Sequence, residues 1–178
     1  MSTRTDSNAD PEAEWHADRP GSQKAPAPRT PPRWLIPWIT RAQVWVYERS
    51  EGRFGARAAR MRHLLLRTVG RRSGRLLTVC LPYWCDEEGR RIVVASFAGA
   101  PHHPAWYHNL ADRGANPEVW VRDRERTLWC RAEVPKGEER DVLWRQLVTD
   151  RPFYDDYQAR TRRTIPLVRL VELRAAER

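Results

Sequence analysis

The sequence has few cysteines and no long run of apolar residues. Its 178 residues include three cysteines, Cys80, Cys85 and Cys130. No segment approaches the roughly 20 consecutive apolar residues that a membrane-spanning helix needs. Residues 1–33 also lack the apolar centre of a secretory signal. Since an odd number of cysteines without such a signal favours reduced thiols, we expect a cytoplasmic protein.

Several motifs of catalytic and metal-binding sites are missing too. No pair of cysteines or histidines has the CxxC or HxxxH spacing of zinc sites, so we expect no metal ion. After residue 33 the serines are Ser50, Ser73 and Ser96, and none lies in a GxSxG nucleophile motif. No glycine-rich Walker or Rossmann motif precedes a helix. The sequence therefore disfavours serine hydrolases and the common nucleotide-binding folds.

Charge of one sign dominates the chain. The formal net charge is +9 and the isoelectric point is near 10.3, which predicts attraction to polyanions. Nucleic acid, anionic lipid and a phosphorylated cofactor are all such partners. Because the basic residues are scattered among 23 acidic ones and no nucleic-acid-binding motif is present, we expect no nucleic-acid partner.

Composition divides the chain into three regions. Residues 1–33 are polar and rich in proline, and we expect a disordered tail there. Residues 34–60 are predicted to form an amphipathic helical segment with Trp38 and Trp45 on one side and arginines on the other. Such an aromatic stripe more often packs against its own domain, and the alternative is contact with the inner face of a membrane. Residues 61–178 are expected to form one cofactor-binding domain.

Short apolar segments separated by turn residues characterise this domain. Many are apolar on both faces, which suits a closed barrel covered by helices. Two helices are predicted at 103–112 and 138–150, the second with acidic residues at its start. We therefore predict a β-rich α+β fold. The predicted strands lie at 63–70, 76–85, 91–98, 119–123, 126–134 and 167–173.

Two groups of residues are candidates for ligand binding. The segment Thr68–Arg75 places two glycines, a serine and three arginines between two strands, a composition that favours phosphate but also fits an ordinary basic turn. Aromatic residues with a hydroxyl group bind planar heterocycles well. The candidates for such a wall are Ser96, Trp106, Tyr107, Tyr154 and Tyr157, which could equally be core or surface residues.

Three longer segments are the most distinctive feature of the sequence. They are LLLRTVGRRSG from Leu64, VVASFAGAPHHPAWYHNLADRGANPEVWV from Val93 and RPFYDDYQARTRRTIPLVRLVEL from Arg151. Together they resemble the deazaflavin-dependent nitroreductase and quinone reductase family over residues 64–173. The resemblance implies a split β-barrel with flanking helices. It also implies coenzyme F-420, a deazaflavin with a phosphate and an oligoglutamate tail, rather than FMN.

The resemblance further implies hydride transfer to a small-molecule acceptor, which would be a quinone, a nitroaromatic or a conjugated enone. The residues that match the family's phosphate-binding loop are Arg71, Arg72 and Ser73, with Arg75 beside them. The residues that match the family's ring-binding positions are Ser96, Ala98, Gly99, Trp106 and Asn109.

Tyr154 and Tyr157 match tyrosines that border the substrate, and we expect them to be catalytic, because a phenol can donate a hydrogen bond or a proton. Tyr83 and Arg151 are expected to contact the substrate as well.

Four positions depart from the family pattern. Leu76 and Leu77 stand where a Pro-Arg pair is usual, although Arg75 could replace the lost cation. Phe97 replaces a lysine, and Arg151 replaces a tyrosine. The last change makes the substrate region more cationic and favours an anionic or biosynthetic enone over generic menaquinone.

Two other functions fit the same residues. The first is cofactor binding without turnover, and the second is cofactor-independent acid–base chemistry on a natural product, with Tyr154, Tyr157 or His102 as the acid or base.

Overall fold

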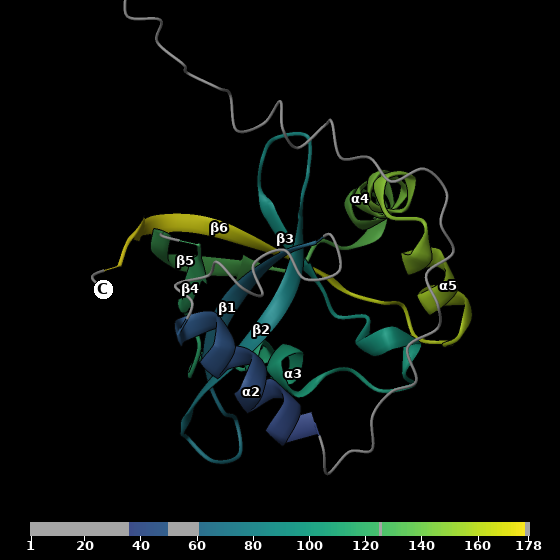
Figure 1. The fold of residues 1–178 in the computed structure, drawn as a ribbon. Coiled ribbons are helices and arrows are strands. Elements are labelled where there is room, and N and C mark those ends of the chain that lie inside the picture. The colour runs from purple at the N-terminus through teal and green to yellow at the C-terminus, as the bar shows by residue number, and fades with distance from the viewer. Residues whose placement is uncertain (1–35, 50–60, 125, 177–178) are drawn as a thin grey trace, which may run out of the picture.

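The structure is a computed structural model that describes residues 36–49, 61–124 and 126–176 (Figure 1). Six antiparallel strands close into a barrel in the order β1-β2-β3-β6-β5-β4. The strands are β1 (Arg62–Val69), β2 (Leu76–Cys85), β3 (Arg91–Val94), β4 (Val119–Asp123), β5 (Arg126–Glu133) and β6 (Leu167–Ala175).

Helices cover the barrel on different sides. Figure 1 shows α4 (Gly137–Asp150) and α5 (Phe153–Ala159) next to each other on one side, and α2 (Ile36–Arg49) and α3 (Ala105–Ala111) near each other on another. A short turn, η2 (Phe97–Gly99), follows β3. It contacts α5.

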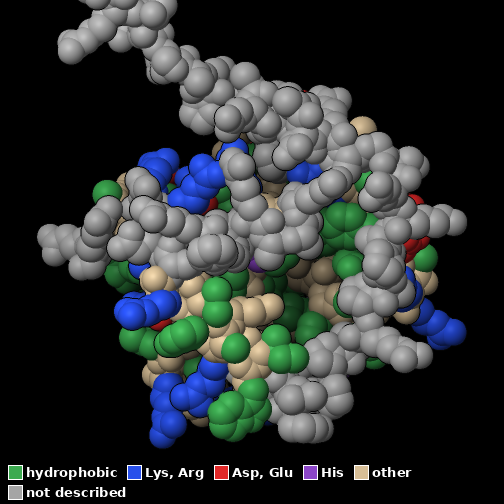
Figure 2. Space-filling model, viewed as in Figure 1, with side chains coloured by type: hydrophobic (Ala, Val, Ile, Leu, Met, Phe, Trp, Pro, Cys, Tyr) green, Lys and Arg blue, Asp and Glu red, His purple; other side chains and the backbone are tan. Residues whose placement is uncertain are grey.

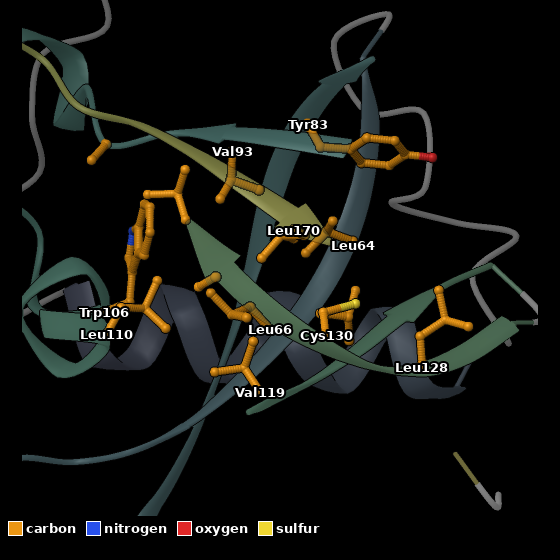
Figure 3. Close-up of a cluster of buried hydrophobic side chains, with 14 residues drawn as sticks. Leu64, Leu66, Tyr83, Val93, Trp106, Leu110, Val119, Leu128, Cys130 and Leu170 are labelled. Atoms are coloured by element: carbon orange, nitrogen blue, oxygen red, sulfur yellow. The ribbon is translucent and has the colours of Figure 1, made fainter. Parts of the chain in front are cut away.

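The barrel interior is built from alternate residues of the strands (Figure 3). On β1, Leu64 and Leu66 point into the main core, whereas Leu65 points outward against Tyr47 of α2. This alternation explains why the strand is apolar on both faces: one face fills the barrel and the other holds a helix. A second cluster joins Trp84 and Ile92 to α4, α5 and the start of β6.

The predicted fold class, a helix-flanked barrel, is confirmed, and each predicted strand and both predicted helices are present within a few residues. Helix α5 was not predicted. The expectation that the tryptophan stripe packs against the domain is wrong: Trp38 and Trp45 are 68% and 65% exposed. Tyr47 and Val44 face Leu65 instead, so they and not the tryptophans hold the helix on the barrel.

Residues 1–33 and 50–60, for which a tail and the end of the helical segment were predicted, lie outside the described residues. Of the helices within the described ranges, none is both long enough and apolar enough to cross a membrane.

Candidate functional site

A pocket of about 750 Å³ lies among α2, β2, the β1–β2 turn, η2 and α3. This size suits a cofactor-sized ligand. Its wall combines apolar side chains with two arginines and three histidines. The lining residues are Thr40, Gly70, Arg71, Arg72, Ser73, Leu77, Val79, Cys80, Leu81, Phe97, His102, His103, Pro104, Ala105, Trp106, His108 and Asn109.

A side chain at position 70 would crowd the tight turn after β1, and Ser73 and Leu77 would have to move. A Cβ atom there would lie 2.8 Å from Ser73 Oγ and 2.9 Å from a methyl group of Leu77. Gly70 also donates its amide to the carbonyl of Arg75 at 2.8 Å. The turn therefore closes on itself and presents the side chains of Arg71 and Arg72 at the pocket.

Most of the turn's backbone amides already have partners. Those of Ser73 and Gly74 donate to the Gly70 carbonyl, and that of Arg75 donates to Ser73 Oγ at 3.3 Å. The glycine-rich composition suggested amides open to an anion, but the turn uses them to stabilise itself. The guanidinium groups of Arg71 and Arg72 are consequently the main donors available for a phosphate.

Asn109 connects α3 to this turn. Its Oδ1 accepts the amide of Arg71 at 3.3 Å, and its Nδ2 donates to Thr68 Oγ1 at 3.1 Å. Asn116 donates in turn to the Asn109 carbonyl at 2.9 Å. Asn109 is buried, so its amide fixes the position of the basic turn relative to the helix that carries Trp106.

Trp106 belongs both to the barrel core and to the pocket wall. It is 7% exposed and packs in the main core cluster. Figure 3 shows its ring on the α3 side of that cluster. The pocket therefore reaches a rigid, mostly buried indole at the edge of the core.

The turn η2 has an unusual backbone. Phe97, Ala98 and Gly99 have φ values of 47°, 53° and 79°, all in the left-handed region. This conformation costs a non-glycine residue about 1–3 kcal/mol and persists only where the surroundings hold it. The structure supplies such support, since Arg163 donates to the carbonyls of Ala95, Ser96 and Ala100.

Burial and positive charge near the pocket lower the pKa values of two of its histidines. The pKa of His108 is lowered by burial and by nearby Arg71, Arg72 and His102. The pKa of His103 is lowered by burial, Arg163 and His108. Both imidazoles therefore favour the neutral form, and the end of the pocket near the basic turn is suited to an anion.

The predicted phosphate-binding and ring-binding residues come together only in part. Arg71, Arg72, Ser73, Trp106 and Asn109 line the pocket. Arg75 is exposed on the turn. Ser96, Ala98 and Gly99 shape the backbone behind Phe97, which is the residue of η2 that reaches the pocket.

The predicted catalytic tyrosines lie beyond η2, on α5. Tyr154 is 4% exposed in the second core cluster, where burial raises the pKa of its phenol. Tyr157 is partly buried, and burial raises its pKa too. Arg151, at the end of α4, opposes the shift of Tyr154 electrostatically, so these three residues lie near one another. None of them is among the described residues that line the pocket.

Tyr83 lies in the barrel interior at a different place. It pairs with Arg62 at the start of β1, whereas the pocket begins after the other end of that strand. Burial and Asp123 raise the pKa of its phenol. The structure therefore does not bring Tyr83 to the pocket.

Sequence reasoning missed the apolar side of the pocket. Thr40 of α2 and Leu77, Val79 and Leu81 of β2 line it, and the alternation along β2 was the available signal. The sequence was searched for histidines only as metal ligands and, at His102, as an acid or base, so the pocket positions of His103 and His108 were not predicted. Within the described residues no group of three or more His, Cys, Asp or Glu side chains is placed to hold a metal ion.

Comparison with known proteins agrees with this geometry. The model of the F420H(2)-dependent quinone reductase family matches residues 38–172. An F420H(2)-dependent quinone reductase of Mycobacterium tuberculosis is 35% identical over 128 residues, which cover 69% of this chain and 83% of the relative.

Two solved structures are also similar. An F420-H2 dependent reductase is 38% identical, with a TM-score of 0.51 over 61% of this chain and 92% of the other. A structure described as a domain-swapped dimer is 32% identical, with a TM-score of 0.54 over 76% of this chain and 98% of the other.

The family match spans both the barrel and the pocket, and it confirms the predicted enzyme class and cofactor, an F-420-dependent reductase of split-barrel type. The chain belongs to the F420H(2)-dependent quinone reductase family.

Proposed function

We propose that this protein reduces a quinone with a hydride from coenzyme F-420 held in the pocket beside Trp106. The observation that carries this proposal is that Arg71, Arg72 and the indole of Trp106 line one pocket. When bound, the reduced cofactor supplies the hydride, and the acceptor takes up that hydride and one proton to become a quinol. Side chains then need to align the two molecules, exclude water and supply the proton.

The basic turn is proposed to hold the cofactor's phosphate and tail. Arg71 and Arg72 offer bidentate guanidinium groups, and Ser73 retains a hydroxyl that can donate. Asn109 holds the turn in place by accepting the amide of Arg71. The ring is proposed to lie against Trp106 and the backbone of η2, where Ser96, Ala98 and Gly99 set the path of the chain.

Tyr157 and Tyr154 remain the proposed catalytic residues on the acceptor side. They lie on α5, which contacts η2, so the acceptor would enter from that side of the turn. The raised pKa of Tyr157 keeps its phenol protonated at neutral pH and able to donate. Arg151 is close to Tyr154 and is proposed to favour an anionic acceptor. Tyr83 lies inside the barrel away from the pocket and is not included among the acceptor contacts proposed here.

The test is oxidation of reduced F-420 by the purified protein with a panel of acceptors: a soluble quinone, a nitroaromatic, and neutral and carboxylated enones. We expect turnover with the quinone, and slower turnover for Tyr157→Phe at unchanged cofactor affinity. Phe153→Leu, a change beside Tyr157 on α5 that removes no hydroxyl, is the control.

The outcomes separate the competing functions. Cofactor binding with no turnover of any acceptor would favour a binding protein. Turnover of an enone without added cofactor would favour acid–base chemistry. Faster turnover of the carboxylated enone, lost in Arg151→Gln, would favour an anionic biosynthetic acceptor over a quinone.

A second proposal concerns where the protein meets a lipid-soluble acceptor. Trp38 and Trp45 are exposed on α2, and Leu76 and Leu77 are 67% and 43% exposed at the start of β2. Figure 2 shows hydrophobic and basic side chains next to one another on the lower part of this face. Apolar and cationic groups in this arrangement are typical of a helix that lies on an anionic membrane surface.

We therefore propose peripheral contact with the inner face of the membrane through α2. Vesicles containing anionic lipid should retain the protein, and Trp38→Ser with Trp45→Ser should release it. Val142→Ser, which removes an exposed apolar residue of α4, is the matched control. Equal retention of the double variant and the control would contradict the proposal.

A further inference from the structure

One guanidinium group reaches four acceptors beside the pocket. Arg163 lies in the segment between α5 and β6 and is partly buried. Its Nε donates to the carbonyl of Ala100 at 2.8 Å, and its Nη2 donates to those of Ala95 and Ser96 at 3.1 and 2.7 Å. Its Nη1 lies 3.0 Å from Nδ1 of His103.

The last contact fixes the tautomer of His103. A guanidinium group has donors and no acceptor, so Nδ1 of the imidazole must accept and cannot carry a proton. In the neutral ring the proton then lies on Nε2. A doubly protonated ring would set an N–H group against the N–H group of Arg163.

The surroundings keep this ring in place and neutral. Tyr107 lies at a ring-centroid distance of 4.9 Å and His108 at 5.7 Å. The titratable or charged groups that face His103 are therefore Arg163, His108 and the phenol of Tyr107. Both basic neighbours disfavour the imidazolium form, and they lower the pKa of His103 together with burial.

We propose that His103 is a ligand-binding residue that donates its Nε2–H to a carbonyl oxygen of the heterocycle in the pocket, with Arg163 as the residue that positions it. His103 lines the pocket and stands just before α3, which carries Trp106. With Nδ1 occupied, Nε2 is the only ring nitrogen left for a ligand. This inference rests on the proposed function in taking the deazaflavin as the ligand.

Arg163 has a second positioning effect. The carbonyls that it binds flank Phe97, Ala98 and Gly99, the left-handed residues of η2. The side chain of Arg163 thus binds both η2 and the imidazole of His103. It fixes the position of the Nε2–H group relative to the backbone of η2.

The first experiment needs no ligand. Long-range ¹⁵N–¹H correlation spectra at neutral pH report which ring nitrogen carries the proton, and His103→Gln identifies the signals of His103. We expect a protonated Nε2 and an unprotonated Nδ1. A protonated Nδ1, or an imidazolium at neutral pH, would overturn the inference.

The second experiment compares F-420 affinity among folded variants at neutral pH. His103→Ala should bind about three- to tenfold more weakly, the loss expected for one hydrogen bond. His103→Gln, which keeps an acceptor for Arg163 and an N–H donor, should recover much of that loss. His63→Gln, outside the pocket lining, is the control.

Arg163→Gln should also weaken binding, and its exposed neighbour Arg162→Gln should not, although both remove one positive charge. If the unaltered protein binds F-420 and His103→Ala binds it equally well, the role of His103 is wrong and the proposed function stands. If the unaltered protein does not bind F-420, the proposed function fails, and with it the assignment of the ligand.

Discussion

A Cβ atom on Gly99 would lie 2.7 Å from the carbonyl oxygen of Tyr157. Gly99 also has a φ of 79°, so two independent constraints require glycine there. The contact joins η2, which borders the pocket, to α5, which carries the proposed catalytic tyrosines. Gly99 therefore lets η2, at the pocket, pack closely against α5, where the acceptor is proposed to bind.

Gly99→Ala should accordingly destabilise the protein and weaken cofactor binding. We expect the free energy of unfolding to fall by about 1–3 kcal/mol from backbone strain, with the steric clash adding to this. Denaturant unfolding measures the effect. Gly114→Ala is the control, because the nearest atom to its new Cβ lies 3.6 Å away. Equal stability of the two variants would mean that η2 tolerates a side chain.

Trp106→Ala should lower both stability and affinity. Removing a buried tryptophan costs about 3–5 kcal/mol of unfolding free energy, and loss of stacking should weaken F-420 binding by about 1–3 kcal/mol. Trp144→Ala is the matched control, since Trp144 is 8% exposed but belongs to the second core cluster. It should lose stability and keep affinity. Unchanged affinity in folded Trp106→Ala would make Trp106 a core residue only.

Anion binding at the basic turn should raise the pKa of His108. Arg71 and Arg72 contribute to lowering that pKa from its ordinary value of 6.5 in the free protein, and a bound phosphate would offset their charge. Because the bound state then takes up protons more readily, F-420 should bind more tightly at about pH 6 than at about pH 8 through this group. NMR titration of the His108 ring signal, with and without bound F-420, measures the shift. A constant His108 pKa would place the anion elsewhere.

Cys80 should react slowly although it lines the pocket. Burial raises the pKa of its thiol from 9.0 to about 11. At about pH 8 its thiolate fraction is then about a hundredfold below that of a thiol with the ordinary value, and the thiolate is the reactive form. Iodoacetamide labelling of the Cys80 peptide, followed by mass spectrometry, should be slow at pH 8, faster at higher pH and fast after unfolding. Rapid labelling of the folded protein at pH 8 would contradict this.

The strands of the barrel could be predicted because their residues alternate or are apolar throughout. Leu64, Leu65 and Leu66 illustrate the second case, since one face of the strand meets the core and the other meets α2. Helix α5 was missed because Phe153 to Ala159 is a short segment whose aromatic residues find their partners only in the tertiary structure. The exposure of Trp38 and Trp45 was missed for a related reason, because Tyr47 and not the stripe meets the barrel.

Site residues could be predicted from the sequence where they belong to a recognisable motif. Roles that depend on contacts between distant parts of the chain could not. Arg71, Arg72, Trp106 and Asn109 were found from their motifs and do meet at the pocket. The role proposed for His103 depends on Arg163, which lies 60 residues further along the chain. These two side chains come together only in the folded chain, where the segment before β6 lies beside the segment between η2 and α3. No local pattern in the sequence therefore relates them.

A fluorescence titration of the purified protein with coenzyme F-420 and, in parallel, with FMN tests the proposed cofactor site most directly. We expect saturable binding of F-420, weaker or absent binding of FMN, and loss of F-420 affinity when Arg71 and Arg72 are both replaced by glutamine. Equal binding of both cofactors, or F-420 binding that survives the double replacement, would contradict the proposed site.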